Sequence, residues 1–121
     1  MSRVVHFEIS ADQPERAVQF YSSVFGWKIN KWSNENYWLA TTGDESEPGI
    51  DGAIQTRSDP NATTVNTIDV ESVEDSVARI QDCGGTILQP KTVIPGIGYW
   101  ALCKDTEGNP FGILQGDPKA A

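Results

Sequence analysis

The sequence repeats one pattern of hydrophobic periodicity, and this duplication limits the fold more than any other feature. At a shift of 59 residues Ile9 meets Ile68. The quartets YWLA at 37–40 and YWAL at 99–102 match at a shift of 62. A repeat of about 60 residues is one supersecondary unit that cannot bury its apolar face alone, so two copies are expected to pack together.

The first copy begins with a strand over 3–10, in which Phe7 and Ile9 fall on one face and His6 and Glu8 on the other. Asp12 and Glu15 then predict a capping box at the start of a helix, and Gly26 predicts its end. Three short strands are predicted to follow, at 27–32, 37–42 and 49–56.

The second copy has the same order: a strand over 63–70, a helix over 72–85, and strands over 86–93, 98–104 and 109–115. Ser72 is the expected N-cap of this helix, and Gly108 lies in a tight turn that needs a positive φ. The predicted fold class is therefore α+β.

Two tandem βαβββ modules, at about 3–57 and 63–116, are expected to form one domain over 1–121. Their strands are expected to make a cup-shaped, partly closed mixed sheet, with the helices outside and a cavity within.

Composition excludes several functions. The formal net charge of −8 opposes nucleic-acid binding. No apolar run reaches the length of a membrane span, and the first residues do not have the pattern of a signal peptide, so we expect a cytoplasmic protein. Cys83 and Cys103 lack metal-ligand spacing and are expected to be buried free thiols.

Particular segments resemble the glyoxalase/bleomycin resistance protein/dioxygenase superfamily, also known as the vicinal oxygen chelate proteins. They are the strand with His6, the helix segment PERAVQFYSSVFGW and the closing segment KDTEGNPFGILQ. The resemblance covers about residues 3–116 and implies the glyoxalase-like fold. It does not imply one reaction, because a fold hosts many functions.

The resemblance also implies where a divalent metal would bind, because metal-dependent members place ligands on the first and last strands of each module. These positions fall at His6, Gly52, Val65 or Thr67, and Gly112, with the two glycines matched at a shift of 60. Of these side chains only His6, the sole histidine, is a usual metal ligand. We therefore expect no metal cofactor.

Seven residues are predicted to contact a ligand: His6, Glu8, Trp38, Gly52, Thr67, Trp100 and Gly112. His6 and Glu8 could also form a simple ion pair, or move a proton as base and partner. The two tryptophans could be core residues or a stacking wall. The two glycines could leave room for a ligand.

The sequence thus favours a protein that binds a small molecule in the sheet cavity, as a homodimer that covers its sheet edges. The alternative is a metal-dependent glyoxalase-like lyase or isomerase, or a dioxygenase. Whether it is an enzyme stays open.

Overall fold

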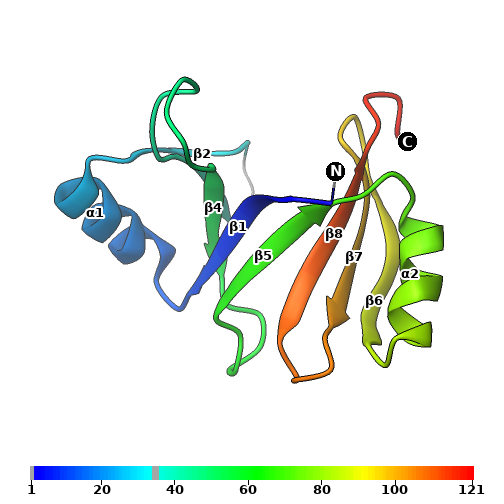
Figure 1. Ribbon diagram of the computed structural model, residues 1–121. Coiled ribbons are helices and arrows are strands. Elements are labelled where there is room, and N and C mark those ends of the chain that lie inside the picture. The colour runs from blue at the N-terminus through cyan, green and yellow to red at the C-terminus, as the bar shows by residue number, and fades with distance from the viewer. Residues whose placement is uncertain (1, 34–35) are drawn as a thin grey trace. The chain divides into compact units, whose positions relative to one another are not determined.

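The chain folds into two compact units, each a β-α-β-β-β module, in a computed structural model that describes residues 2–33 and 36–121. The first unit is His6–Val65, and the second combines residues 2–5 with Asn66–Ala121. The predicted α+β class and the repeated order of elements are confirmed (Figure 1). The cavity within a cup stays a prediction.

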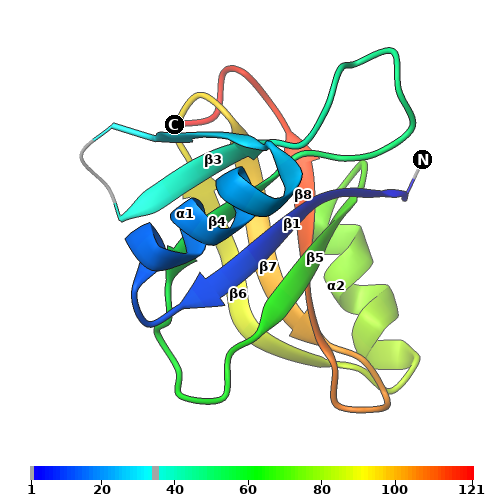
Figure 2. The ribbon, with the colours of Figure 1, turned by 90° about the vertical axis from the view of Figure 1, so that its left-hand side faces the viewer.

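The first unit contains a mixed sheet in the order β2-β3-β4-β1. Strands β1 and β4 are parallel, and the other neighbours are antiparallel. The helix α1 contacts β2 and β4, on one face of this sheet (Figure 2). The elements are β1 Val4–Ala11, α1 Pro14–Phe25, β2 Lys28–Lys31, β3 Tyr37–Thr41 and β4 Gly52–Thr56.

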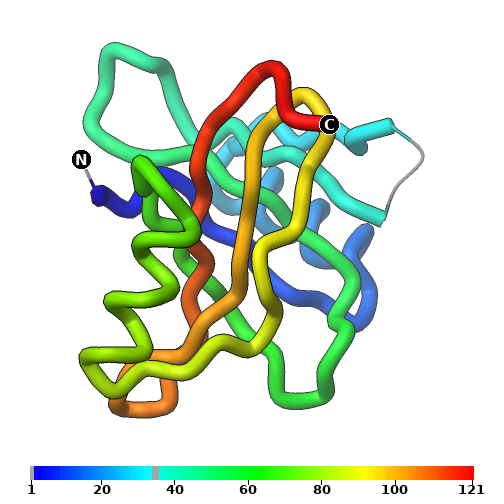
Figure 3. The backbone as a smooth tube through the Cα atoms, turned by 90° about the vertical axis from the view of Figure 1, so that its right-hand side faces the viewer, coloured from blue at the N-terminus to red at the C-terminus, as the bar shows by residue number. Residues whose placement is uncertain are grey.

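The second unit has the corresponding order, β6-β7-β8-β5, with β5 and β8 parallel. Strands β6, β7 and β8 run side by side, and α2 contacts all three (Figure 3). The elements are β5 Thr64–Asp69, α2 Val73–Asp82, β6 Thr86–Ile94, β7 Gly98–Lys104 and β8 Pro110–Gly116.

The predicted capping box of α1 is wrong. The N-cap residue is Gln13, and its side chain makes no capping hydrogen bond. Asp12 instead accepts a hydrogen bond from Arg57 Nε at 2.8 Å, because a guanidinium is a stronger donor than a backbone N–H. The predicted end of the helix is confirmed, since Gly26 has a φ of 72°.

The predicted cap of α2 is confirmed. Ser72 Oγ accepts a hydrogen bond from the backbone N–H of Asp75 at 3.1 Å. Gln115 Oε1, on β8, accepts from the N–H of Val73 at 3.0 Å. Two of the N–H groups that an isolated helix leaves without partners are thus satisfied here.

Each sheet makes most of its core contacts on the face that carries the helix. In the second unit the buried hydrophobic core cluster consists of Val73, Ala101, Cys103 and Ile113. In the first unit the Tyr21 ring stacks on that of Trp27 at 4.8 Å between centroids. Cys103 is buried as predicted, but the prediction for Cys83 is wrong, because it is exposed where α2 ends.

The repeated quartets occupy corresponding strands, β3 and β7. Their structurally equivalent positions are shifted by one residue relative to the sequence match. Trp38 pairs with the buried Ile54, whereas the residue that pairs with the buried Ile113 is Ala101. A one-residue slip turns every side chain of a strand to the other face. Tyr37, not Trp38, is therefore the structural counterpart of Trp100.

The last strands show a similar slip. Ile54 pairs with Ile9, and Ile113 pairs with Ile68, so a shift of 59 holds for these strands too. The shift of 60 that matched Gly52 with Gly112 is wrong by one residue. No helix among the described residues is both long and apolar enough to cross a membrane.

The cap of α2 gives a stability test. Ser72→Ala removes the hydroxyl that accepts from Asp75 N–H, so the free energy of unfolding should fall by about 1 kcal/mol. Urea denaturation followed by circular dichroism measures this change. Ser76→Ala, inside the same helix, is the control and should have little effect. An equal loss in both variants would contradict the capping role.

Candidate functional site

Each sheet has one face on which no helix of the described residues lies, and we call it the open face. In the first unit the helix face holds Phe7 and Ile9, so the alternating residues His6 and Glu8 lie on the open face. This agrees with the faces predicted for the first strand. Tyr37 also lies on the open face, because its hydroxyl contacts both of these polar side chains.

The Tyr37 hydroxyl joins His6 and Glu8 into one chain of hydrogen bonds. It lies 2.5 Å from Glu8 Oε2 and 3.1 Å from His6 Nε2. The direct separation between Nε2 and Oε2 is 3.7 Å, which is too long for a hydrogen bond. The predicted histidine–carboxylate pair therefore exists, but tyrosine bridges it.

The small residue between these strands makes the bridge possible. Ala53 on β4 pairs with Glu8 on one side and with Leu39 on the other. It is fully buried and offers only a methyl group on the open face. The Tyr37 side chain can therefore span β4 and reach the residues of β1.

The chain of hydrogen bonds fixes the tautomer of His6. The Tyr37 hydroxyl has one proton, which it donates to the Glu8 carboxylate. It can therefore only accept from His6, so the proton of the imidazole is on Nε2. In neutral His6 the lone pair on Nδ1 is then available as an acceptor.

Ionisation follows from the same contacts. Burial raises the pKa of Glu8, but the His6 imidazole and the Tyr37 hydroxyl outweigh burial and hold the pKa below its usual value. Burial and the adjacent Glu8 carboxylate raise the pKa of Tyr37 far above its usual value. At neutral pH Glu8 is therefore ionised and Tyr37 keeps its proton.

Trp38 and Gly52 lie away from this cluster. Trp38 pairs with Ile54 on the helix face, where it lines a groove with residues of α1. Gly52 pairs with Phe7, and an added Cβ would lie 2.5 Å from the Phe7 ring. The structure thus places both residues on the face opposite His6.

The other three predicted residues lie together on the open face of the second unit. Thr67 pairs with Gly112, and an added Cβ at Gly112 would lie 2.8 Å from Trp100 Nε1 and 3.1 Å from Thr67 Oγ1. The indole of Trp100 therefore occupies the space beside the glycine. The partly exposed Trp100 provides an aromatic surface there, whereas Thr67 is buried, with only 3% of its surface exposed.

Sequence reasoning missed Tyr37 and Asp51. The repeated quartets drew attention to tryptophan, although alternation from Ala40 could have indicated that Tyr37 and Trp38 face opposite sides. Gly52 pairs with Phe7 in the parallel register of β1 and β4. Asp51, one residue before Gly52, is therefore at the level of His6, one residue before Phe7. Its Oδ1 accepts from Thr42 N–H at 2.9 Å.

The open-face residues do not fit the divalent metal that the resemblance implies. His6 Nε2 and Glu8 Oε2 are both engaged with Tyr37, and Thr67 and Gly112 adjoin an indole instead of a carboxylate or imidazole. Over residues 2–33 and 36–121, no three His, Cys, Asp or Glu side chains gather as a metal site. Stable sites usually need three or four protein ligands.

Comparison with known proteins agrees with this architecture. Residues 3–43 match the family described as bleomycin resistance protein-like N-terminal. The protein CFP32 of Mycobacterium tuberculosis, provisionally named a glyoxylase, is 26% identical over 120 residues. That match covers 93% of this chain and 43% of CFP32, and the Mycobacterium bovis protein matches equally. The chain thus spans less than half the length of these curated relatives.

Solved structures show the same fold. A superfamily member from Vibrio splendidus has a TM-score of 0.65 at 16% identity, covering 93% of this chain and 97% of that one. A Streptomyces coelicolor methylmalonyl-CoA epimerase variant, bound to 2-nitronate-propionyl-CoA, has a TM-score of 0.63 at 15% identity, covering 100% and 99%. These structures confirm the glyoxalase-like fold. The family match over residues 3–43 and the similarity to CFP32 agree with the superfamily resemblance.

The hydrogen bonds of Tyr37 give a titration test. Tyr37→Phe removes a donor from the Glu8 carboxylate, so the pKa of Glu8 should rise toward or above its usual value. Because a lowered pKa stabilises the folded state above the unfolded-state pKa and this stability is lost in acid, the variant should be less stable at neutral pH, and acid should destabilise it less through Glu8 than it destabilises the native protein. Carbon-13 NMR of the Glu8 carboxyl measures the change. Trp38→Phe, on the opposite face, should leave this pKa unaltered, and a shift there would argue against a local cause.

Proposed function

We propose that this chain, which has the glyoxalase-like fold and resembles the glyoxalase/bleomycin resistance protein/dioxygenase superfamily, binds a small molecule on its open faces without a metal cofactor. The observation that carries the proposal is the chain of hydrogen bonds Glu8–Tyr37–His6. Polar side chains on a sheet face cost free energy unless they are partnered, and such sites commonly fix ligands.

The exposure of this cluster supports a role in binding. The side chains of His6 and Glu8 are 28% and 17% exposed, so they are mostly withdrawn from water but still reachable. Each retains acceptor capacity: Nδ1 of neutral His6 and the second oxygen of Glu8. The cluster therefore suits a ligand that donates hydrogen bonds through N–H or O–H groups.

The second unit supports the proposal with a different chemistry. The partly exposed Trp100 indole beside Gly112 provides an aromatic surface, and Thr67 lies buried next to the same glycine. Such a surface favours a flat apolar body over a highly charged one. A largely apolar molecule with a few N–H or O–H donors would match the acceptors of the first open face and, independently, the aromatic surface of the second.

The donor set favours binding without a metal over the metal-dependent lyase, isomerase or dioxygenase alternative. Those chemistries use a divalent ion as a Lewis acid. In this chain the residues at the implied ligand positions, other than His6, are glycine, threonine or valine. A homodimer in the cytoplasm stays a prediction.

A thermal-shift screen, followed by calorimetry, tests the binding proposal. Ligands carrying N–H or O–H donors on an apolar body should stabilise the protein. Tyr37→Phe should weaken their binding about tenfold, because the tautomer of His6 is no longer fixed and Glu8 loses its partner. Trp38→Phe is the matched control with unchanged affinity. If the affinity for these ligands is the same in the native protein, in Tyr37→Phe and in His6→Ala, the open face of the first unit does not anchor them.

Metal titration tests the second part of the proposal. After treatment with chelator, the protein should bind Ni²⁺, Zn²⁺, Mn²⁺ and Fe²⁺ no more tightly than about 0.1 mM by calorimetry, roughly −5.5 kcal/mol. Tight stoichiometric binding that His6→Ala abolishes would instead favour the metal-dependent alternative.

A further inference from the structure

A second candidate site lies on the helix face of the first unit. A groove of about 430 Å³ runs between α1 and β1, and its volume is in the range of small-molecule sites. It is independent of the open-face cluster because it lies on the other side of the sheet. The residues that matter here are Ile9, Arg16, Ala17, Phe20, Tyr21 and Arg57.

The floor and wall of the groove are apolar and aromatic. The Phe20 ring contacts that of Tyr21 edge to face at 5.1 Å, and Tyr21 stacks in turn on Trp27. Phe20 is 55% exposed, and α1 has no buried residue at all. An aromatic wall of this kind can receive a planar ring.

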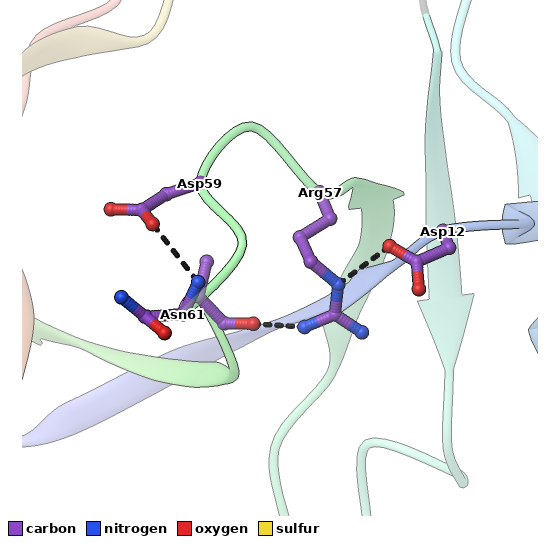
Figure 4. Close-up of polar contacts among 5 residues, drawn as sticks. Asp12, Arg57, Asp59 and Asn61 are labelled. Carbon is purple, nitrogen blue, oxygen red and sulfur yellow. Dashed lines mark hydrogen bonds and ion pairs between the residues drawn. The ribbon is translucent and has the colours of Figure 1, made fainter.

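The rim of the groove carries two arginines, Arg16 and Arg57, and in the described part of the chain only Arg57 is paired with a carboxylate. Arg57 Nε donates to Asp12 Oδ1 at 2.8 Å, and the same guanidinium donates to the carbonyl of Ala62 (Figure 4). The charge of Arg57 is therefore balanced by Asp12. Arg16 is the remaining charged lining residue, and no ion pair of its side chain occurs among the described residues.

The duplicated fold supplies an internal comparison. The second unit has a groove of about 560 Å³ at the corresponding place, where Ile68 stands at the position of Ile9 and Ile80 at that of Tyr21. At the position of Arg16 this groove has Asp75. Glu71 and Arg79 also line the second groove, so its net charge is −1. The first groove is lined by Asp12, Arg16 and Arg57 and has a net charge of +1.

We propose that the groove between α1 and β1 is a binding site for a planar aromatic carboxylate, with the ring against Phe20 and the carboxylate on Arg16. Arginine pairs with carboxylates through two parallel N–H donors, which selects this group over other anions of similar size. The local positive charge is notable in a chain of net charge −8, which would otherwise repel such a ligand.

Titration with 2-naphthoate, followed by amide NMR shifts, tests the site on the full chain. Saturable shifts should be confined to residues 9–21 and 57, whereas 2-naphthylmethylamine, of opposite charge, should bind more weakly. Arg16→Asp gives the first groove the charge of the second and should weaken 2-naphthoate at least about fivefold. Asp75→Arg, in the second unit, is the matched control and should leave the affinity of the first groove unchanged.

The open-face variant separates this site from the proposed function. Tyr37→Phe should not alter 2-naphthoate binding, even if the open face binds nothing. The groove proposal would be overturned by shifts centred on His6 and Tyr37, by equal affinity for the amine, by no saturable shift at all, or by unchanged affinity in Arg16→Asp. Circular dichroism of Arg16→Asp checks that the exposed substitution preserves the fold.

Discussion

Each unit has one helix and a sheet with two faces, and the other properties of the protein depend on this imbalance. The helix covers one face, where the branched and aromatic side chains gather. The strands still alternate, so half of their residues point to a face that no helix of the same unit covers. Any polar group there must find a partner or stay in contact with water.

The first unit meets this requirement with three side chains from two strands. Glu8 is the costly member, because a carboxylate that is largely withdrawn from water needs donors. Tyr37 gives it a short hydrogen bond, and His6 completes the chain. These contacts lower the pKa of Glu8 against the effect of burial. The same arrangement leaves acceptors on His6 and Glu8 for a ligand.

Much of the fold could be predicted from the sequence, because periodicity, the Ser72 cap and the glycine at the end of α1 are local signals. The capping box failed because its Asp12 pairs with Arg57, 45 residues away, which no local pattern reveals. The pairing of β-strands is also non-local. A one-residue error in aligning Gly52 with Gly112 was enough to put a residue on the wrong face.

The candidate site was predicted only in part, for the same reason. His6 and Glu8 share a strand, so their shared face followed from alternation. Tyr37 joins them from β3, across β4, and that contact depends on the buried Ala53 between them. Trp38 was a plausible aromatic ligand contact on composition, yet its strand turns it toward α1. The composition of the site thus depends on side-chain contacts between strands, which the order of residues in the sequence does not reveal.

The tautomer of His6 follows directly from the chain Glu8–Tyr37–His6, and one measurement determines it. Since His6 is the only histidine, long-range proton–nitrogen correlation NMR gives one imidazole spectrum without assignment. With the imidazole neutral, we expect a proton on Nε2 and an unprotonated Nδ1. Tyr37→Phe should allow the two tautomers to mix. A native protein with the proton on Nδ1 would contradict the chain Glu8–Tyr37–His6, and with it the proposed anchor for a ligand.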